Sequence, residues 1–328
     1  MNDARTGSVV TLGETMAVLT PTTANRPGPG CPLRVGIGGA ESNVAVAVTR
    51  LGAVGTWIGR VGDDDLGRLV VRELRAEGVR VLSETDPRAP TGLLLKEMRA
   101  GRPRRVRYYR RGSAGSKLSP ADVDRAAPAI AGADLLHLTG ITAALGSQPL
   151  AALHRAVESA RGSGTRVSFD VNHRRTLWPD ATAAPVLRSL AAAADLVFAG
   201  PEEAALLLGR TPPGEPTVSD GKELAAALCA LGPDTAVVKL GALGAVAAHE
   251  GALVHEPARP VTVVDAVGAG DAFAGGYLAE LLRGLPPVQS LRTGNALGAA
   301  VSATAGDWEG LPTRAELADR VLGAEVVR

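Results

Sequence analysis

The stretch DAVGAGDAFAGG, residues 265–276, places the acid Asp271 directly after small residues, at the expected start of a helix. Free N–H groups and the positive end of a helix dipole suit a phosphate, which a carboxylate would repel. In phosphoryl transfer, the amides of Gly268, Ala269 and Gly270 could hold phosphoryl oxygens while Asp271 accepts the proton of an attacking hydroxyl. The competing interpretation is a glycine turn with Asp271 as a helix cap.

Two arginine-rich stretches point to an anionic ligand. RYYRRGSAGSKLSP, residues 107–120, joins two tyrosines to several arginines, and FDVNHRRTLW, residues 169–178, covers the end of an expected strand. The planar arginine fork suits a carboxylate or phosphate, and tyrosine adds a rigid hydroxyl. If both stretches converge on one pocket they favour an acidic substrate. The alternative is an exposed face on an arginine-rich protein.

Apolar runs alternate with helical patterns along most of the chain, which predicts an α/β fold with a mostly parallel, doubly wound sheet and helices on both faces. The expected strands are residues 8–14, 133–140, 166–172, 194–200 and 235–241. The expected helices are residues 40–52, 65–78, 148–164, 271–284, 287–305 and 313–322. Ligands of such sheets bind at the carboxyl ends of the strands, so the chemistry should gather there.

Residues 14–37 and 90–111 break this rhythm, because each shows short alternating strands without an intervening helix. The second segment is typical of an antiparallel hairpin around AGRP. We therefore expect one domain, residues 1–328, with a small β-sheet lid inserted in its α/β core. A thin sheet has few burial partners, so we expect it to close over the site, or to be covered by another subunit in a dimer or larger homo-oligomer.

Composition excludes several classes of protein. The net charge is +1 and basic and acidic residues are interleaved, so neither a nucleic-acid groove nor a membrane-binding patch is expected. No run approaches ~18 apolar residues, and the N-terminus lacks a signal-peptide pattern. Cys31 and Cys229 lack metal-site spacing, which favours free thiols and a cytoplasmic location. A P-loop, a dinucleotide fingerprint, H-E-x-x-H and G-x-S-x-G are absent.

VVDAVGAGDAFAGG, residues 263–276, resembles the C-terminal signature of the ribokinase-like (phosphofructokinase B) carbohydrate kinases. GGAESNVAVAVTRLG, residues 38–52, followed by GRVGDDDLG, residues 59–67, resembles the N-terminal signature of the same family. The resemblance covers nearly the whole chain. It implies a ribokinase-like fold with a small β lid, ATP and Mg²⁺ as cofactors, and Asp271 as the catalytic base above an anion hole at 268–270. It leaves a requirement for a monovalent cation open.

The same resemblance implies nucleotide and metal contacts. KLGALG, residues 239–244, is similar to the family's nucleotide loop, and Asn295 matches a nucleotide-contacting position. The implied nucleotide-binding residues are Lys239, Gly241, Ala242, Gly244, Gly268, Gly270 and Asn295. Glu203 is the metal candidate, although Gly200 stands where many members carry the asparagine of N-x-x-E. Without the family, these residues would be a strand with a tight turn, a packed asparagine and a solvated helix face.

Substrate contacts follow from two further likenesses. The N-terminal signature places GGAESN, residues 38–43, at the sugar, where glycines allow close approach and Asn43 can bind hydroxyls. A helix start that needs small residues would also explain the two glycines. YYR-x-G-S-A and D-x-N-x-R…LW resemble the 2-keto-3-deoxygluconate kinase branch. The implied substrate-binding residues are Gly38, Gly39, Ala40, Glu41, Ser42, Asn43, Tyr108, Arg110, Asp170, Asn172, Arg174 and Asp271.

The reaction implied by this branch is phosphorylation of the 6-hydroxyl of 2-dehydro-3-deoxy-D-gluconate by ATP. Leu94 stands where that branch often has a tyrosine, which leaves the sugar acid, gluco or galacto, open. A kinase of a neutral sugar, ribose or fructose, is the alternative within the family. A non-catalytic sugar-acid sensor is disfavoured because a sensor needs no base, and a dinucleotide oxidoreductase because its fingerprint is missing.

Overall fold

The computed structural model describes residues 7–23, 27–99 and 102–322. The strands are β1 Ser8–Leu12, β2 Met16–Pro21, β3 Leu33–Gly38, β4 Val54–Gly62, β5 Arg80–Asp86, β6 Leu93–Arg99, β7 Arg102–Tyr109, β8 Leu135–Thr139, β9 Arg166–Asp170, β10 Leu196–Ala199, β11 Thr235–Lys239, β12 Ala245–His249 and β13 Ala252–Glu256. The α-helices are α1 Ala40–Arg50, α2 Asp65–Ala76, α3 Pro120–Ala131, α4 Gly140–Ala143, α5 Ser147–Ser163, α6 Asp180–Ala192, α7 Pro201–Leu208, α8 Val218–Cys229, α9 Ala269–Leu281, α10 Pro287–Ser302 and α11 Arg314–Leu322.

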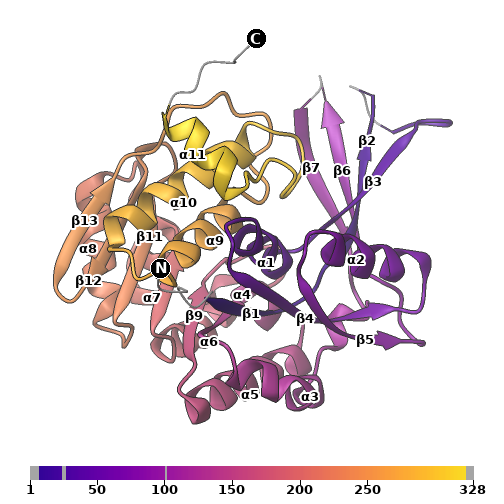
Figure 1. Cartoon of the computed structure of the whole chain (residues 1–328), viewed down its shortest axis with the longest axis horizontal. Helices are drawn as coiled ribbons and strands as arrows, with labels where there is room; N and C mark the ends of the chain where they lie inside the picture. The colour runs from indigo at the N-terminus through magenta and orange to yellow at the C-terminus, as the bar shows by residue number, and fades with distance from the viewer. Residues whose placement is uncertain (1–6, 24–26, 100–101, 323–328) are drawn as a thin grey trace, which may run out of the picture.

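The strands form two separate sheets (Figure 1). The main sheet has nine strands in the order β13-β12-β11-β10-β9-β8-β1-β4-β5, and the small sheet has four in the order β3-β2-β6-β7. From β11 to β5 every neighbouring pair is parallel, while β12 and β13 add antiparallel strands at one edge. The predicted mostly parallel sheet with a second, small sheet is confirmed.

Helices cover both faces of the main sheet. One hydrophobic cluster joins the sheet to α3, α5, α6, α7 and α8, and the other joins it to α1, α2, α9 and α10. Neighbouring strand residues enter opposite clusters, as Val9 and Val10 do in β1 and Val197 and Phe198 do in β10. Because side chains alternate across a strand, a sheet buried on both faces needs apolar residues at consecutive positions. The doubly wound arrangement follows from these continuous apolar runs.

The small sheet is built from the two segments that broke the helical rhythm. β2 and β3 form one antiparallel hairpin, β6 and β7 form another, and β2 pairs in parallel with β6. The tip of the expected turn at AGRP includes 100–101, which lie outside the described residues. In Figure 1 these four strands rise from the body beside α1 and α2. The small sheet therefore stands next to the start of α1, where the N-terminal signature begins.

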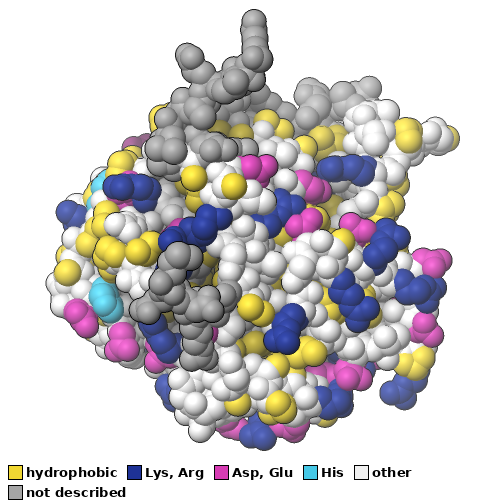
Figure 2. Space-filling model, in the orientation of Figure 1, with side chains coloured by type: hydrophobic (Ala, Val, Ile, Leu, Met, Phe, Trp, Pro, Cys, Tyr) yellow, Lys and Arg dark blue, Asp and Glu magenta, His cyan; other side chains and the backbone are white. Residues whose placement is uncertain are grey.

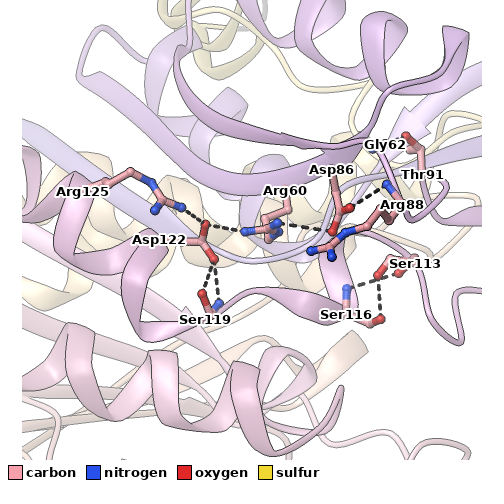
Figure 3. A network of polar contacts seen from close by, with 10 residues as sticks. All are labelled: Arg60, Gly62, Asp86, Arg88, Thr91, Ser113, Ser116, Ser119, Asp122 and Arg125. Atoms are coloured by element: carbon pink, nitrogen blue, oxygen red, sulfur yellow. Dashed lines mark hydrogen bonds and ion pairs between the residues drawn. The ribbon is translucent and has the colours of Figure 1, made fainter.

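A polar network anchors both ends of the β6–β7 hairpin to the main sheet (Figure 3). Arg60 in β4 donates through Nη2 to Asp86 Oδ2 (3.3 Å), just before the hairpin, and through Nη1 to Asp122 Oδ1 (2.8 Å), just after it. The N–H and hydroxyl of Ser119 both donate to Asp122 Oδ2 at 2.8 Å. Asp86 and Asp122 are each only 3% exposed. One guanidinium thus bridges two buried carboxylates and ties together the segments on either side of the hairpin; Arg125, which also pairs with Asp122, adds a second positive charge.

Figure 2 shows how the charged side chains are distributed on one face of the molecule. On the face drawn in Figure 2, the lysine and arginine side chains of the described residues are dispersed among acidic and uncharged ones. None of the helices in the described part of the chain combines the length and apolar character needed to cross a membrane.

Replacing Arg60 by methionine should lower the free energy of unfolding by about 2–4 kcal/mol. It leaves buried Asp86 without an ion-pair partner in the described part of the chain, and Asp122 with only the half-exposed Arg125. The matched control is Arg125→Met. Arg125 also pairs with Asp122 but is 49% exposed, so its loss should cost less than about 1 kcal/mol. Urea unfolding of both variants measures the difference, and equal costs would show that the hairpin anchor does not depend on Arg60.

Candidate active site

A cavity of about 890 Å³ opens where the carboxyl ends of the parallel strands meet the small sheet. Its wall comes from the start of α1, the segments after β9 and β10, the last residue of β11, the turn that begins α9, and strands of the small sheet. Parallel strands carry their carboxyl ends to one edge, which is why segments distant in sequence meet here.

Most of the predicted site residues line this cavity. They are Gly38, Gly39, Ala40, Asn43, Tyr108, Arg110, Asp170, Asn172, Arg174, Glu203, Lys239, Gly268, Gly270 and Asp271. Seven predicted residues do not contribute to the wall: Glu41, Ser42, Gly241, Ala242, Gly244, Ala269 and Asn295. The fold therefore brings parts of both signatures and parts of both arginine-rich stretches into a single cavity.

Asp271 lies in the first turn of α9 and is held between two amides. Asn43 Nδ2 donates to its Oδ2 at 2.8 Å, and Asn172 Nδ2 donates to its Oδ1 at 3.3 Å. Burial raises the pKa of Asp271 to about 7; the Asn43 hydrogen bond opposes this rise, and the nearby Asp170 carboxylate adds to it. A carboxylate with a pKa near neutrality is suited to accept and release a proton at physiological pH.

Asn172 owes its position to an unusual backbone. Its φ is 37°, in the left-handed region that asparagine tolerates better than most residues, and its side chain is buried. Its backbone N–H donates to Asp170 Oδ1 at 3.3 Å. The chain therefore turns sharply as soon as β9 ends, and this turn aims the amide at Asp271.

The turn before α9 offers free amides to the cavity. Gly268 has a φ of 80°, and a Cβ there would lie 1.9 Å from the carbonyl oxygen of Asp307, so only glycine fits. The Ala269 N–H already donates to Ala266 O at 3.3 Å. Within the described residues, the N–H groups of Gly268 and Gly270 have no acceptor. These two amides, at the positive end of a helix, can receive an anion.

Asp170 and Lys239 form an ion pair at the floor of the cavity. Lys239 Nζ lies 2.7 Å from Asp170 Oδ2. Burial disfavours the charged amine, but attraction from Asp170, Glu203 and Asp271 outweighs it and raises the pKa of Lys239. The ammonium therefore stays charged at the ends of β9 and β11 and offsets the negative charge of the site.

Glu203 braces the cavity wall. Its Oε2 accepts the Gly200 N–H at 2.7 Å, closing the start of α7, and its Oε1 accepts the His173 N–H at 2.8 Å. No group of three or more metal-ligating side chains occurs among the described residues. Magnesium keeps several waters and often binds through one or two carboxylates plus substrate phosphates. The donor set thus fits an ion that arrives with a nucleotide rather than one held in a protein cage.

The predicted substrate arginines have different surroundings. Arg110 is buried and donates from Nε to Glu14 Oε2 at 2.7 Å, with its guanidinium 5.7 Å from the Tyr108 ring centroid. Its charge is therefore already balanced. Arg174 is exposed, lines the cavity and has no carboxylate partner in the described part of the chain. An anion that enters the cavity would therefore meet, at Arg174, a guanidinium that no ion pair occupies, although its charge already lowers the pKa of Asp271.

Glu41 and Ser42 support the site from behind. Glu41 Oε1 accepts the hydroxyls of Thr139 (2.6 Å) and Thr142 (2.7 Å), and Ser42 Oγ donates to Gly39 O at 3.0 Å. Burial raises the pKa of Glu41. Both side chains point into the protein, so their contacts fix the start of α1 against the end of β8. Asn43 is thereby presented to Asp271.

The predicted nucleotide loop lies beyond the cavity wall. Gly241 and Ala242 are exposed, while Gly244 packs so closely on the Glu256 carbonyl that a Cβ would lie 2.1 Å from it. Asn295 Nδ2 donates to the same Glu256 carbonyl at 2.9 Å. These residues shape the chain that leaves β13, and their contact with a nucleotide stays a prediction.

Sequence reasoning missed several residues of the wall. Glu14, the partner of Arg110, lies between β1 and β2, and Asp265 and Asp307 flank the turn before α9. Asp265 is the first acid of the quoted motif, so its place in the wall could have been predicted from the motif. Glu14 and Asp307 carry no local signal, because only the fold brings them to the cavity.

A family model for pfkB family carbohydrate kinases matches residues 6–314. The chain belongs to this family of carbohydrate kinases. Its members include a 2-dehydro-3-deoxygluconokinase from Thermoproteus tenax, 39% identical to this chain over 97% of its length and 94% of the relative. The expected family and enzyme class are confirmed, since the kinase match spans almost the whole chain.

Solved structures place the kinase in the same fold. The structure of 2-dehydro-3-deoxygluconokinase from Thermotoga maritima superposes with a TM-score of 0.86 at 25% identity, covering 96% of this chain and 98% of that one. An Escherichia coli protein provisionally named ribokinase II, solved with ATP and Mg²⁺, gives a TM-score of 0.84 at 25% identity, covering 97% and 99%. These structures confirm the ribokinase-like fold.

The backbone at Asn172 generates a prediction about this kinase. Both Asn172→Ala and Asn172→Gly remove the amide that faces Asp271, but only alanine pays the steric cost of a positive φ. The free energy of unfolding of the Asn172→Ala variant should therefore be about 1 kcal/mol lower than that of Asn172→Gly, as measured by denaturant unfolding. Alanine as stable as glycine would show that the left-handed turn is not required.

Proposed function

We propose that the kinase phosphorylates the 6-hydroxyl of 2-dehydro-3-deoxy-D-gluconate with ATP, giving the 6-phosphate and ADP. One observation carries the proposal. A carboxylate held between two amides at a helix start shares its cavity with Arg174, a cation without a carboxylate partner. The Asp271 carboxylate is suited to accept the proton of an alcohol, and the Arg174 guanidinium is suited to bind the carboxylate of a sugar acid. The relative from Thermoproteus tenax, named for this substrate, supports the choice.

The proposed chemistry divides between the base and the anion hole. The 6-hydroxyl oxygen forms a bond to the γ-phosphorus, the bond from that phosphorus to the ADP oxygen breaks, and the hydroxyl proton passes to Asp271. The amides of Gly268 and Gly270 stabilise charge on the transferring phosphoryl oxygens. With a pKa near 7, Asp271 is ionised in a large fraction of molecules at neutral pH, so it can accept this proton.

Magnesium fits the proposal through the nucleotide. When bound, it would neutralise charge on the phosphates, as in other phosphoryl-transfer sites. Glu203, at the cavity wall, is the proposed metal contact, through the acceptor capacity that its two backbone hydrogen bonds leave on the carboxylate oxygens. The proposed nucleotide-binding residues remain Lys239, Gly241, Ala242, Gly244, Gly268, Gly270 and Asn295.

The small sheet is proposed as a lid and as a subunit contact. Its outward residues Leu33, Val35 and Tyr109 are 40%, 48% and 61% exposed, an unusual amount of apolar surface on a four-stranded sheet. Covering this face with a second subunit would bury it. We therefore expect a dimer or larger homo-oligomer in sedimentation velocity, and Val35→Glu should dissociate it. A parent protein that sediments as a monomer would contradict this expectation.

Replacing Asp271 by alanine should lower kcat by roughly 10²–10⁴-fold, because the attacking hydroxyl loses its base. Binding of the sugar acid, measured by calorimetry, should change little.

In the parent, kcat/KM should rise with pH through about 7, because the base works only when ionised. Asn43→Ala should move this limb to higher pH, since it removes a hydrogen bond that favours the ionised form. A pH-independent rate would contradict the assignment.

Replacing Arg174 by alanine should raise KM for the sugar acid by roughly 10–100-fold, the worth of a charged hydrogen bond. KM for ribose should change by less than about threefold, because ribose has no carboxylate. Arg175→Ala is the matched control, since Arg175 already donates to Asp180 at 3.0 Å. Equal effects of Arg174→Ala on both sugars would favour the neutral-sugar alternative.

The substrate itself is tested by ADP release from the purified kinase. The panel contains 2-dehydro-3-deoxygluconate, its galacto epimer, ribose and fructose, each with ATP and Mg²⁺. The proposal expects the highest kcat/KM with the gluco acid. Preference for a neutral sugar, or ADP release without phosphorylation of any acid, would overturn it.

A further inference from the structure

Lys96 forms a buried ionic cluster outside the roles assigned above. It belongs to β6 of the small sheet and is only 1% exposed. Its Nζ lies 2.7 Å from Asp265 Oδ2 and 2.7 Å from Asp307 Oδ1, and those side chains are 3% and 6% exposed. Lysine is rarely buried so completely unless it is paired. A charge taken out of water needs a compensating structural reason.

Asp265 connects this cluster to the anion-hole turn. Asp265 Oδ2 accepts a hydrogen bond from the Lys96 ammonium, and Asp265 Oδ1 accepts the Val267 N–H at 3.1 Å. The Asp265 N–H donates to Ser302 O at 3.2 Å, which fastens the residue to the end of α10. The Asp265 carboxylate therefore holds the first bend of the turn, and Gly268 follows immediately after it.

Asp307 connects the same ammonium to Gly268 from the other side. Its backbone carbonyl packs on Gly268, and its Oδ2 packs on Gly38 at the end of β3, each so closely that no Cβ would fit there. The next residue, Trp308, donates its indole N–H to Ile37 O at 3.0 Å. The segment carrying Asp307 is thus wedged between the small sheet and the anion-hole turn.

We infer that Lys96 is a positioning residue for phosphoryl transfer: from the small sheet, its ammonium clamps Asp265 and Asp307 and thereby holds the Gly268 and Gly270 amides in place. The inference rests on the proposed function of that turn. It extends that function, because the anion hole is then complete only while the small sheet lies where its lysine can reach both carboxylates. A change in the position of the small sheet would therefore also change the shape of the anion hole.

The charges explain why a cation is required at this point. Without the ammonium, Asp265 and Asp307 would face each other as buried like charges. Burial raises the pKa of Asp307, while Lys96 opposes that rise. Burial disfavours the charged lysine, but the two carboxylates outweigh it and raise its pKa. Removing the cation leaves the carboxylates to repel each other or take up protons, and either response releases the turn.

The first experiment compares Lys96→Met with the parent, using Lys222→Met on the exposed face of α8 as the matched control. Hydrogen exchange followed by mass spectrometry should show amides of 265–270 exchanging at least roughly tenfold faster in Lys96→Met, with α5 unchanged. The kcat for the best sugar should fall by roughly 10–100-fold, with KM changed less than about threefold. Lys222→Met should match the parent in both measurements.

Chemical rescue separates the cation from mere packing. In Lys96→Ala the missing atoms have the size of propylammonium, and both carboxylates line the cavity through which it can enter. Added propylammonium should restore kcat at least roughly fivefold, whereas tetramethylammonium, which has no N–H donors, should not. If the single variants do not fold, Lys96→Met combined with Asp307→Asn removes one buried carboxylate, and this double variant should fold but remain slow.

The outcomes are distinct. Exchange and kcat in Lys96→Met within about twofold of the parent, or a double variant with the full parental kcat, would overturn the inference. Equal rescue by both ammonium ions would also overturn it. If the parent phosphorylates none of the sugars in the panel, the proposed function fails, and the exchange of 265–270 still decides whether Lys96 holds the turn.

Discussion

The central constraint on this kinase is that negative groups must share one small, buried space. A carboxylate that accepts a proton has to lie beside a site suited to a phosphate, and each repels the other. The structure offsets this repulsion with fixed dipoles and cations: amides from Asn43 and Asn172, free N–H groups at the start of α9, and the Lys239 ammonium. Each comes from a different segment, so the site needs the whole fold to exist.

The parallel sheet meets that need through geometry. The ends of β8, β9 and β11 and the starts of α1 and α9 reach the same edge, so strand ends supply side chains while helix starts supply N–H groups. The small sheet adds the remaining wall. Its hairpin is anchored at both ends by Arg60, and its strand β6 carries Lys96 to the turn before α9. Two sheets thus define one cavity.

Counting arginines in the sequence overstates how many are available to a ligand. Arg110 belongs to the stretch that suggested an anionic substrate, yet it is paired with Glu14, and Arg175 is paired with Asp180. The sequence has nearly as many acidic residues (34) as basic ones (35), so many arginines can find a partner, and only the fold decides which do. Arg174 differs because it lines the cavity and forms no ion pair with any described carboxylate, although its charge lowers the pKa of Asp271. An acidic substrate is therefore favoured by the arginines that line the cavity without an ion pair in the described residues, Arg174 and also Arg105, more than by the composition of the two stretches.

The sequence alone determined the features with a local cause. Apolar runs predicted the buried parallel strands, helical periodicity predicted α1, α2, α5 and the C-terminal helices, and the glycine turn before Asp271 predicted an amide-lined helix start. It did not reveal β4, β5, β12 and β13, whose glycines, charged residues and short lengths weaken the alternation on which a strand prediction depends.

Only the tertiary structure decided which charges are neutralised. Glu14 lies 96 residues from Arg110, and Lys96 lies 169 residues from Asp265. Nothing in either local stretch encodes such a pairing, because an ion pair forms wherever chain topology brings two charges together. The turn of Glu41 away from the cavity has the same origin, since the hydroxyls that bind it arrive on β8 and α4. Sequence motifs identified which groups could do the chemistry, and the fold determined which of them are free to do it.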